Sequence, residues 1–191
     1  NELNSIIKYG TKAHIGTLLT EVEYRLDIFI LLFFLNATAV GIYSIGVTMA
    51  QILWYVSNSV NTVLFPYLAS SSTKDLDLFT VRILKYTLFS NTLVIFGLIL
   101  VGFPLVQLLY GPMFSEAYFI FLVLSPGLLS DSIARSLAAW LKGTDRALAL
   151  SKVSSVSLAV NILFCIILIP DWGIYGAALS SMISYTLRAI M

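Results

Sequence analysis

The sequence predicts an all-α, polytopic membrane helix bundle with about six transmembrane helices, and three observations lead to this fold class. Of the 191 residues, 59% are apolar and only 11% are charged, whereas roughly a quarter of the residues in a soluble domain are charged. A span of the hydrocarbon core needs about 20 helical residues, so this length holds about six spans with short loops. The 46 residues 28–73 contain no charged residue, which leaves room for two successive spans. A water-soluble globular domain is therefore excluded.

Breaks in the apolar pattern place each helix in turn. The polar residues 36–38 separate the first span from the second, and the Ser/Thr run 70–73 separates the second from the third. Gly111-Pro112 ends the third span, residues 143–145 end the fourth, and residues 170–173 separate the last two, because these residue types do not continue a helix. The expected spans are about 15–35, with the helix extending back to about Ser5, then 39–68, 78–103, 116–141, 147–169 and 174–190.

The positions of the basic residues predict the topology. With six spans both chain ends share one side of the membrane, and nine of the eleven basic residues fall on that side. The nine are Lys8, Lys12, Lys74, Arg82, Lys85, Lys142, Arg146, Lys152 and Arg188. The opposite turns hold only Glu116 and Asp171. Because lysine and arginine stay on the cytoplasmic side, we expect both ends to be cytoplasmic in a cell inner membrane, with these nine residues contacting lipid headgroups.

Signatures of catalysis are weak. His14 is the only histidine and Cys165 the only cysteine, so neither a histidine metal pair nor a disulfide is expected. Asp75-Leu76-Asp77 resembles a metal-binding D-x-D motif, but it follows a Ser/Thr run where acidic residues favour a helix start. We expect no enzyme activity, no cofactor, no metal and no nucleic-acid partner. Because the chain begins with Asn1, we also expect an internal or C-terminal fragment of a longer protein.

Four charged residues cluster in the first span. Glu21 and Arg25 lie 40° apart on one helix face, where a salt bridge between them is expected, and Glu23 and Asp27 form a second pair on nearly the opposite face. One narrow cavity does not easily receive both pairs, so one pair should meet a neighbouring helix or water. The cluster is either a hydrated functional cavity or a compensated structural group; the first is favoured because buried ion pairs are a poor source of stability.

Two further spans carry polar patterns. Asp131 and Arg135 form an i, i+4 pair in the fourth span, where Arg135 either serves function or extends to the cytoplasmic interface. The second span has a polar stripe that either lines an aqueous path or hydrogen-bonds another helix; its members are Ser44, Thr48, Gln51, Tyr55, Asn58 and Thr62. In the last span, small residues predict close helix packing; they are Gly173, Gly176, Ala177, Ser180, Ser181 and Ser184.

Several of these segments, in this order and spacing, resemble the C-terminal half of polysaccharide-biosynthesis flippases. The matching segments are Tyr24-Arg25-Leu26-Asp27, residues 39–44 (AVGIYS), 64–69 (LFPYLA), 109–114 (LYGPMF), 161–170 and 173–178 (GIYGAA). The resemblance covers nearly the whole chain. It implies the superfamily of multidrug, oligosaccharidyl-lipid and polysaccharide exporters, in which two six-helix lobes surround a central cavity, so this chain would be the second lobe.

The resemblance implies transport of a polyprenyl-diphosphate-linked oligosaccharide by alternating access, with the missing N-terminal lobe and membrane lipids as partners. It marks the region of Arg25 and Asp27 as a cavity position. Independently, a guanidinium suits a diphosphate because it binds oxygens in pairs and keeps its charge. The candidate substrate-binding residues are Arg25, Asp27, Glu21, Glu23, Gln51, Tyr55, Asn58, Asp131 and Arg135.

Two alternatives remain open at this stage. A cation-coupled multidrug antiporter of the same superfamily would favour a cavity dominated by carboxylates, which Arg25 argues against. An integral-membrane enzyme or a lipid-binding subunit would be indicated by metal-dependent activity at Asp75 and Asp77.

Overall fold

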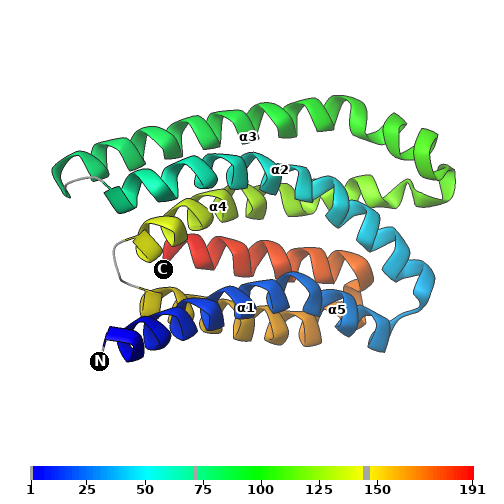
Figure 1. Cartoon of the computed structure of the whole chain (residues 1–191). Helices are drawn as coiled ribbons and strands as arrows, with labels where there is room; N and C mark the ends of the chain where they lie inside the picture. Colours follow the sequence, from blue (N-terminus) through cyan, green and yellow to red (C-terminus); the bar gives the residue numbers. More distant parts are fainter. Residues whose placement is uncertain (1, 71–72, 144–146) are drawn as a thin grey trace.

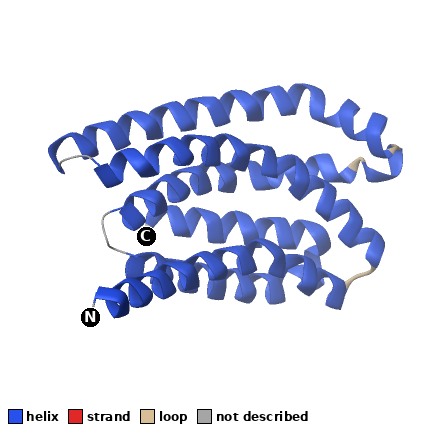
Figure 2. Ribbon diagram, in the orientation of Figure 1, coloured by secondary structure: helices blue, strands red, loops and turns tan. Residues whose placement is uncertain are grey.

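The computed structural model is a bundle of long helices, and every element among the described residues is helical (Figures 1 and 2). It describes the backbone of residues 2–70, 73–143 and 147–191. Side chains are described outside residues 1–13, 15–16, 60–61, 63–80, 82–83, 139–140 and 142–148. The elements are α1 (Glu2–Phe34), α2 (Ala37–Ser70), α3 (Thr73–Tyr110), the short 3-10 helix η1 (Pro112–Phe114), α4 (Glu116–Gly143) and α5 (Ala147–Ile190). The prediction of an all-α fold is confirmed.

Helix α5 is a helical hairpin rather than one straight rod. Gly173 has φ 56° and ψ −131°, which interrupts the helix immediately after Pro170 and Asp171, and the positive φ suits a residue without a Cβ atom. The two halves then run back side by side, and Asn161 of the first half donates to Ser181 of the second at 3.3 Å. The turn predicted at residues 170–173 is confirmed, as is the one at Gly111, where φ is 90°.

Four stretches of the described chain are long and apolar enough to cross a membrane. They are Ala37–Ser59, Leu84–Tyr110, Pro112–Ala138 and Ala149–Ile190. The last of these contains both halves of the α5 hairpin, while α1, with four charged residues between positions 21 and 27, is not among them. The chain is therefore a multi-pass membrane bundle, and the number of six spans stays a prediction.

Small residues allow the central helices to approach closely. A Cβ atom on Gly46 of α2 would lie 2.7 Å from the Ala117 carbonyl oxygen of α4, and one on Gly127 of α4 would lie 2.7 Å from the Met182 Cα of α5. Close backbone approach stabilises helix pairs in lipid, because apolar side chains gain little by exchanging contacts with lipid chains for contacts with another helix. Helix α4 therefore packs between α2 and α5, while α1 packs mainly on α5.

Helix α3 lies at the outer edge of the bundle, beside α2 and α4 (Figure 1). Its outer face exposes large apolar side chains, among them Phe89 and Leu108, which are 70% and 83% exposed. In a membrane bundle such a face meets lipid chains. Both chain ends lie at one end of the bundle, and the α1–α2 and α3–α4 turns lie at the other (Figure 1).

Candidate functional site

The charged segment of α1 divides between two faces. Glu21 and Arg25 are exposed, whereas Glu23 and Asp27 are 0% and 2% exposed and point into the bundle. The expectation that the two pairs meet different surroundings is confirmed. The expected salt bridge between Glu21 and Arg25 is not formed. The ion pairs among the described residues all involve the buried carboxylates Glu23 and Asp131.

Helix α4 supplies the second half of the buried cluster. The Arg135 Nε atom donates to Asp131 Oδ2 at 2.8 Å, so the predicted i, i+4 pair is confirmed. The Tyr24 hydroxyl group of α1 lies 3.1 Å from each Asp131 carboxylate oxygen and donates to this carboxylate. Asp131, which is fully buried, therefore joins α1 to α4.

Arg188, near the end of α5, completes the cluster. Its Nη2 atom lies 2.8 Å from Asp131 Oδ1, and its Nη1 atom lies 3.2 Å from Glu23 Oε2. The sequence analysis expected Arg188 to contact lipid headgroups, and that expectation is wrong: the residue is only 6% exposed. Two buried carboxylates attract its guanidinium inward, and an unpaired buried carboxylate would be far more costly than the pair.

Aromatic rings surround both guanidinium groups. The Arg135 Cζ atom lies 4.8 Å from the Tyr24 ring centre and 4.5 Å from that of Trp54. The Arg188 Cζ atom lies 5.0 Å from the Tyr24 ring centre and 5.2 Å from that of Tyr185. Ring faces attract cations, and more strongly where water is excluded. Arg135 is thus held inside the bundle. It does not extend to the interface, which was one of the two alternatives left open by the sequence.

Asp27 differs from the other two buried carboxylates because its hydrogen-bond partners are neutral. It accepts from the Tyr43 hydroxyl group, from the Ile28 backbone N–H at 2.8 Å and from the Ser181 hydroxyl group at 3.2 Å. Glu23 and Asp131 are matched in charge by Arg135 and Arg188. Among the buried acids of the described residues, Asp27 is therefore the one without an arginine partner, and a proton or a cation would neutralise it most directly.

The small-residue face of the last helical segment joins the same network. Ser157 donates to Glu23 Oε1 at 2.7 Å and lies 2.9 Å from the Ser184 carbonyl oxygen. Ser180, Ser181 and Ser184 are all fully buried, so the predicted packing role of this face is confirmed. Of these three serines, Ser181 also donates to the Asp27 carboxylate of α1, at 3.2 Å.

The polar stripe of α2 remains largely on the surface. Thr48, Tyr55, Asn58 and Thr62 are exposed, while Gln51 is half-buried. One contact ties the stripe to the cluster, since the Arg135 Nη1 atom lies 3.4 Å from Asn58 Oδ1. The two threonines of the stripe bond to their own helix: Thr48 donates to the Ser44 carbonyl oxygen at 2.8 Å and Thr62 to the Asn58 carbonyl oxygen at 2.9 Å. The stripe thus presents polar groups outward beside the charged cluster.

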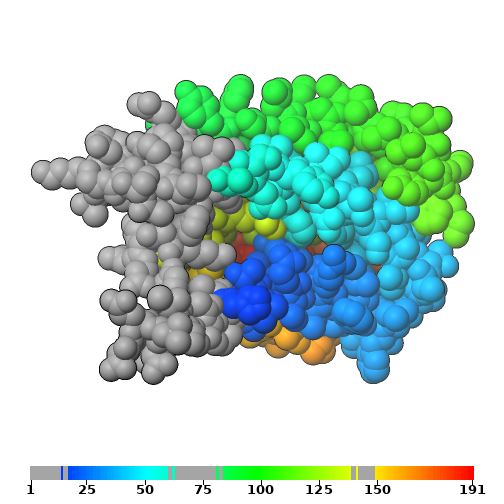
Figure 3. Space-filling view, in the orientation of Figure 1, coloured from blue at the N-terminus to red at the C-terminus, as the bar shows by residue number. Residues whose placement is uncertain are grey.

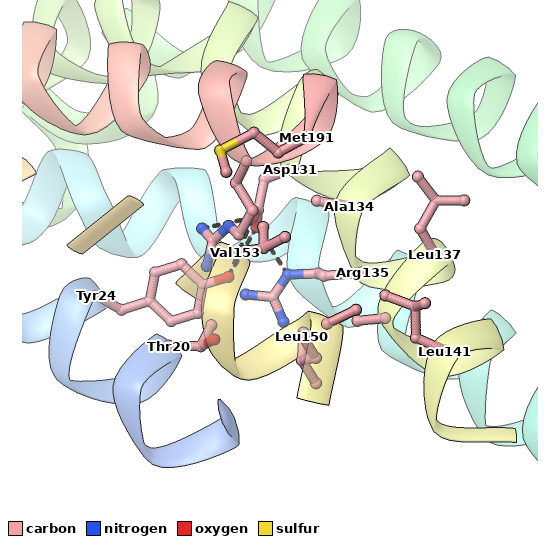
Figure 4. A pocket seen from close by; sticks show the side chains of 13 residues that line it. Thr20, Tyr24, Asp131, Ala134, Arg135, Leu137, Leu141, Leu150, Val153 and Met191 are labelled. Atoms are coloured by element: carbon pink, nitrogen blue, oxygen red, sulfur yellow. Dashed lines mark hydrogen bonds and ion pairs between the residues drawn. The ribbon is translucent and has the colours of Figure 1, made fainter. Parts of the chain in front are cut away.

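The cluster lies at the edge of a pocket of about 250 Å³ between α1, α4 and α5 (Figure 4). Thr20, Tyr24, Asp131, Arg135 and Arg188 provide its polar wall, and the rest of the lining is mostly aliphatic. In the space-filling view, atoms of α4 and α5 are visible in a hollow between α1 and α2 (Figure 3).

In the part of the chain that the structure describes, no group of three histidine, cysteine or acidic residues is arranged to hold a metal ion. The side chains of Asp75 and Asp77 lie outside the described residues. The same is true of six of the nine basic residues assigned to the cytoplasmic side: Lys8, Lys12, Lys74, Arg82, Lys142 and Arg146. Lys85 and Lys152 are exposed.

Residues 1–119 match the model of a protein family described as polysaccharide biosynthesis protein. The chain belongs to this family. The matched residues include the charged segment of α1 and the polar stripe of α2. The resemblance noted in the sequence is thereby confirmed.

Two curated relatives extend this result. A probable low-salt glycan biosynthesis flippase of Haloferax volcanii is 20% identical over 87% of this chain and 36% of its own length. An uncharacterized membrane protein of Methanocaldococcus jannaschii is 27% identical over 96% of this chain and 37% of its own length. The chain thus spans little more than a third of these relatives. No solved structure matches the chain.

Sequence reasoning missed Arg188 as a member of the cluster. One signal could have found it: Arg188 follows Ser181 and Ser184 at helical spacing, so it continues the small-residue face that was predicted to pack inward. A cation on a buried face requires a buried anion, and Glu23 and Asp131 were available. Ser157 and Asn161 were also missed, since single polar residues in an apolar helix do not reveal their partners.

Proposed function

We propose that this chain is part of a flippase that moves a polyprenyl-diphosphate-linked oligosaccharide across the cytoplasmic membrane by alternating access, for the synthesis of cell-surface polysaccharide. Membership in the polysaccharide biosynthesis protein family supports the pathway. The relative named as a glycan biosynthesis flippase supports transport rather than catalysis.

The observation that carries the proposal is the state of Arg25. This residue is exposed on α1, and the ion pairs among the described residues involve other groups. An arginine within a membrane bundle is expensive unless it has a functional partner. A diphosphate is such a partner, because its oxygens accept paired hydrogen bonds from a guanidinium that keeps its charge.

The α2 stripe suits the sugar part of the substrate. Gln51, Tyr55 and Asn58 provide amide and hydroxyl groups on one helix face, and the Tyr55 ring is 70% exposed. Amides hydrogen-bond to sugar hydroxyl groups in either direction, since they both donate and accept. In this proposal the stripe and Arg25 face a central cavity that the missing N-terminal lobe completes.

The buried acids have a separate role. Glu23 of α1 and Asp131 of α4 both pair with Arg188 of α5, which holds the three helices together, and Arg135 pairs with Asp131 within α4. Asp27, which has neutral partners, changes its charge state during the transport cycle and couples it to the driving force, while exposed Glu21 tunes the charge beside Arg25. Both ends of the chain lie in the cytoplasm, because the basic residues gather at that side.

Depletion of the full-length protein in its native cell tests the function. We expect lipid-linked oligosaccharides to accumulate in the cytoplasmic leaflet while sensitivity to cationic drugs is unchanged. Complementation with an Arg25→Ala variant should fail at equal membrane abundance. A Lys152→Ala variant, which removes an exposed cation from α5, should restore export. Normal intermediates together with drug hypersensitivity would instead identify a multidrug antiporter.

A further inference from the structure

An apolar groove runs along α1 on a different side from the buried charge cluster. It has a volume of about 460 Å³, and all of its lining residues are apolar: Leu26, Phe29, Ile30, Phe33 and Phe34 of α1, with Ile162 and Ile166 of α5. Phe29 and Phe33 are 69% and 83% exposed. In Figure 3 this part of α5 emerges along the edge of α1.

Arg25 immediately precedes Leu26, the first residue of α1 that lines the groove. It lies four residues before Phe29, so the two side chains are 40° apart on the same exposed face. Its guanidinium forms no ion pair with a described residue, although exposed Glu21 lies one turn away. An apolar groove that ends at an unpaired cation is complementary to an anionic lipid, with its phosphate at Arg25 and its chain beside the phenylalanines.

The depth of Arg25 distinguishes between two kinds of anionic lipid. Helix α1 ends at Phe34, nine residues beyond Arg25, which is about 14 Å along a helix. Because the hydrocarbon core is about 30 Å thick, a helix ending at its outer surface places Arg25 close to mid-depth. A resident phospholipid keeps its phosphate at the surface. A phosphate at Arg25 therefore belongs to a lipid whose headgroup is crossing the membrane.

We propose that the α1–α5 groove binds the apolar chain of the lipid-linked substrate while Arg25 binds its diphosphate. This inference rests on the proposed function and adds the path that the chain takes. The groove follows α1 from Leu26 to Phe34, a rise of about 12 Å, so it holds the segment of chain next to the diphosphate. The remainder of the chain stays in the bilayer.

Binding to the purified full-length protein in nanodiscs tests the groove. The probe is polyprenyl diphosphate without sugar, and phosphatidylglycerol serves as the competing phospholipid. Ile166→Trp fills the groove from an exposed position of α5, and Leu100→Trp makes the same change on the exposed face of α3. We expect Ile166→Trp and Arg25→Gln each to weaken probe binding about tenfold, the loss expected for one charge-assisted or well-packed contact, and Leu100→Trp to leave it unchanged.

The outcomes separate this inference from the proposed function. If Ile166→Trp binds the probe like the wild type while Arg25→Gln does not, the groove is wrong and the flippase proposal survives. If phosphatidylglycerol displaces the probe at equal concentration from the wild type, the groove is a general lipid contact, and the inference fails. If the wild-type protein does not move the complete glycolipid across the bilayer of liposomes, the proposed function itself is wrong. Phe33→Ala, which removes an exposed wall of the groove, should weaken probe binding without unfolding the bundle.

Discussion

Replacing Arg188 with glutamine removes the cation that two buried carboxylates share. Glu23 and Asp131 lie 3.2 and 2.8 Å from its guanidinium nitrogens, and both are fully buried. Removing one partner of a buried ion pair costs about 3–5 kcal/mol. Because Arg135 still neutralises Asp131, the loss falls mainly on Glu23, and we expect the lower end of that range. The unfolding equilibrium should therefore shift by roughly two orders of magnitude.

Denaturant unfolding of the full-length protein in detergent measures this change. Lys152→Gln is the matched control, since it removes an exposed cation from the other half of the α5 hairpin, and it should change stability by less than about 0.5 kcal/mol. Adding Glu23→Gln to Arg188→Gln removes the uncompensated anion, so the double variant should recover about 1 kcal/mol or more. Equal stability of Arg188→Gln and the control would refute the buried network.

Three further predictions follow from single residues. Gly46→Ala should destabilise the bundle by about 1–3 kcal/mol, since its Cβ atom would lie 2.7 Å from Ile120 Cβ. Gly97 has open space around it, so Gly97→Ala should be neutral or stabilising in the same denaturant assay. Arg135→Lys keeps the charge but loses the planar stack over two rings, so the thermal midpoint should fall by an amount equivalent to about 1–2 kcal/mol; an unchanged midpoint would argue against stacking. Asp27→Asn keeps an oxygen that can accept hydrogen bonds from Tyr43 and Ser181, so the variant should fold. Its transport in vesicles should no longer depend on the ion gradient, and retained dependence would assign the coupling to another residue.

Local features of the sequence were enough to predict the fold class and the nearest contacts. The low charge content and long apolar runs predict a helical membrane bundle, because only helices and closed barrels satisfy the backbone in lipid. Gly111 and Gly173 mark turns, and both adopt positive φ values. The Asp131–Arg135 pair and the opposite faces of α1 follow from helical periodicity alone. Each of these predictions depends on residues within one or two turns of one another.

Contacts between distant segments could not be predicted in the same way. Arg188 and Glu23 are 165 positions apart, and the positive-inside rule explained Arg188 as a headgroup contact without requiring a buried partner. The rule describes averages over loop and helix-end residues, whereas the direction of one side chain depends on the acids that neighbouring helices place beside it. Helical periodicity assigns the charged residues of α1 to two opposite faces, but it does not say which face is buried.

The central claim is that Arg25 contacts the substrate while the buried arginines hold the bundle together. The most direct measurement is the rate at which purified full-length protein, reconstituted in liposomes, moves a polyprenyl-diphosphate-linked oligosaccharide between leaflets. With Arg25→Gln the rate should fall about tenfold or more, the loss of one charge-assisted contact, with unchanged stability, while Lys152→Gln transports normally. A wild-type rate for Arg25→Gln would contradict the account, since the exposed arginine would then have no part in transport.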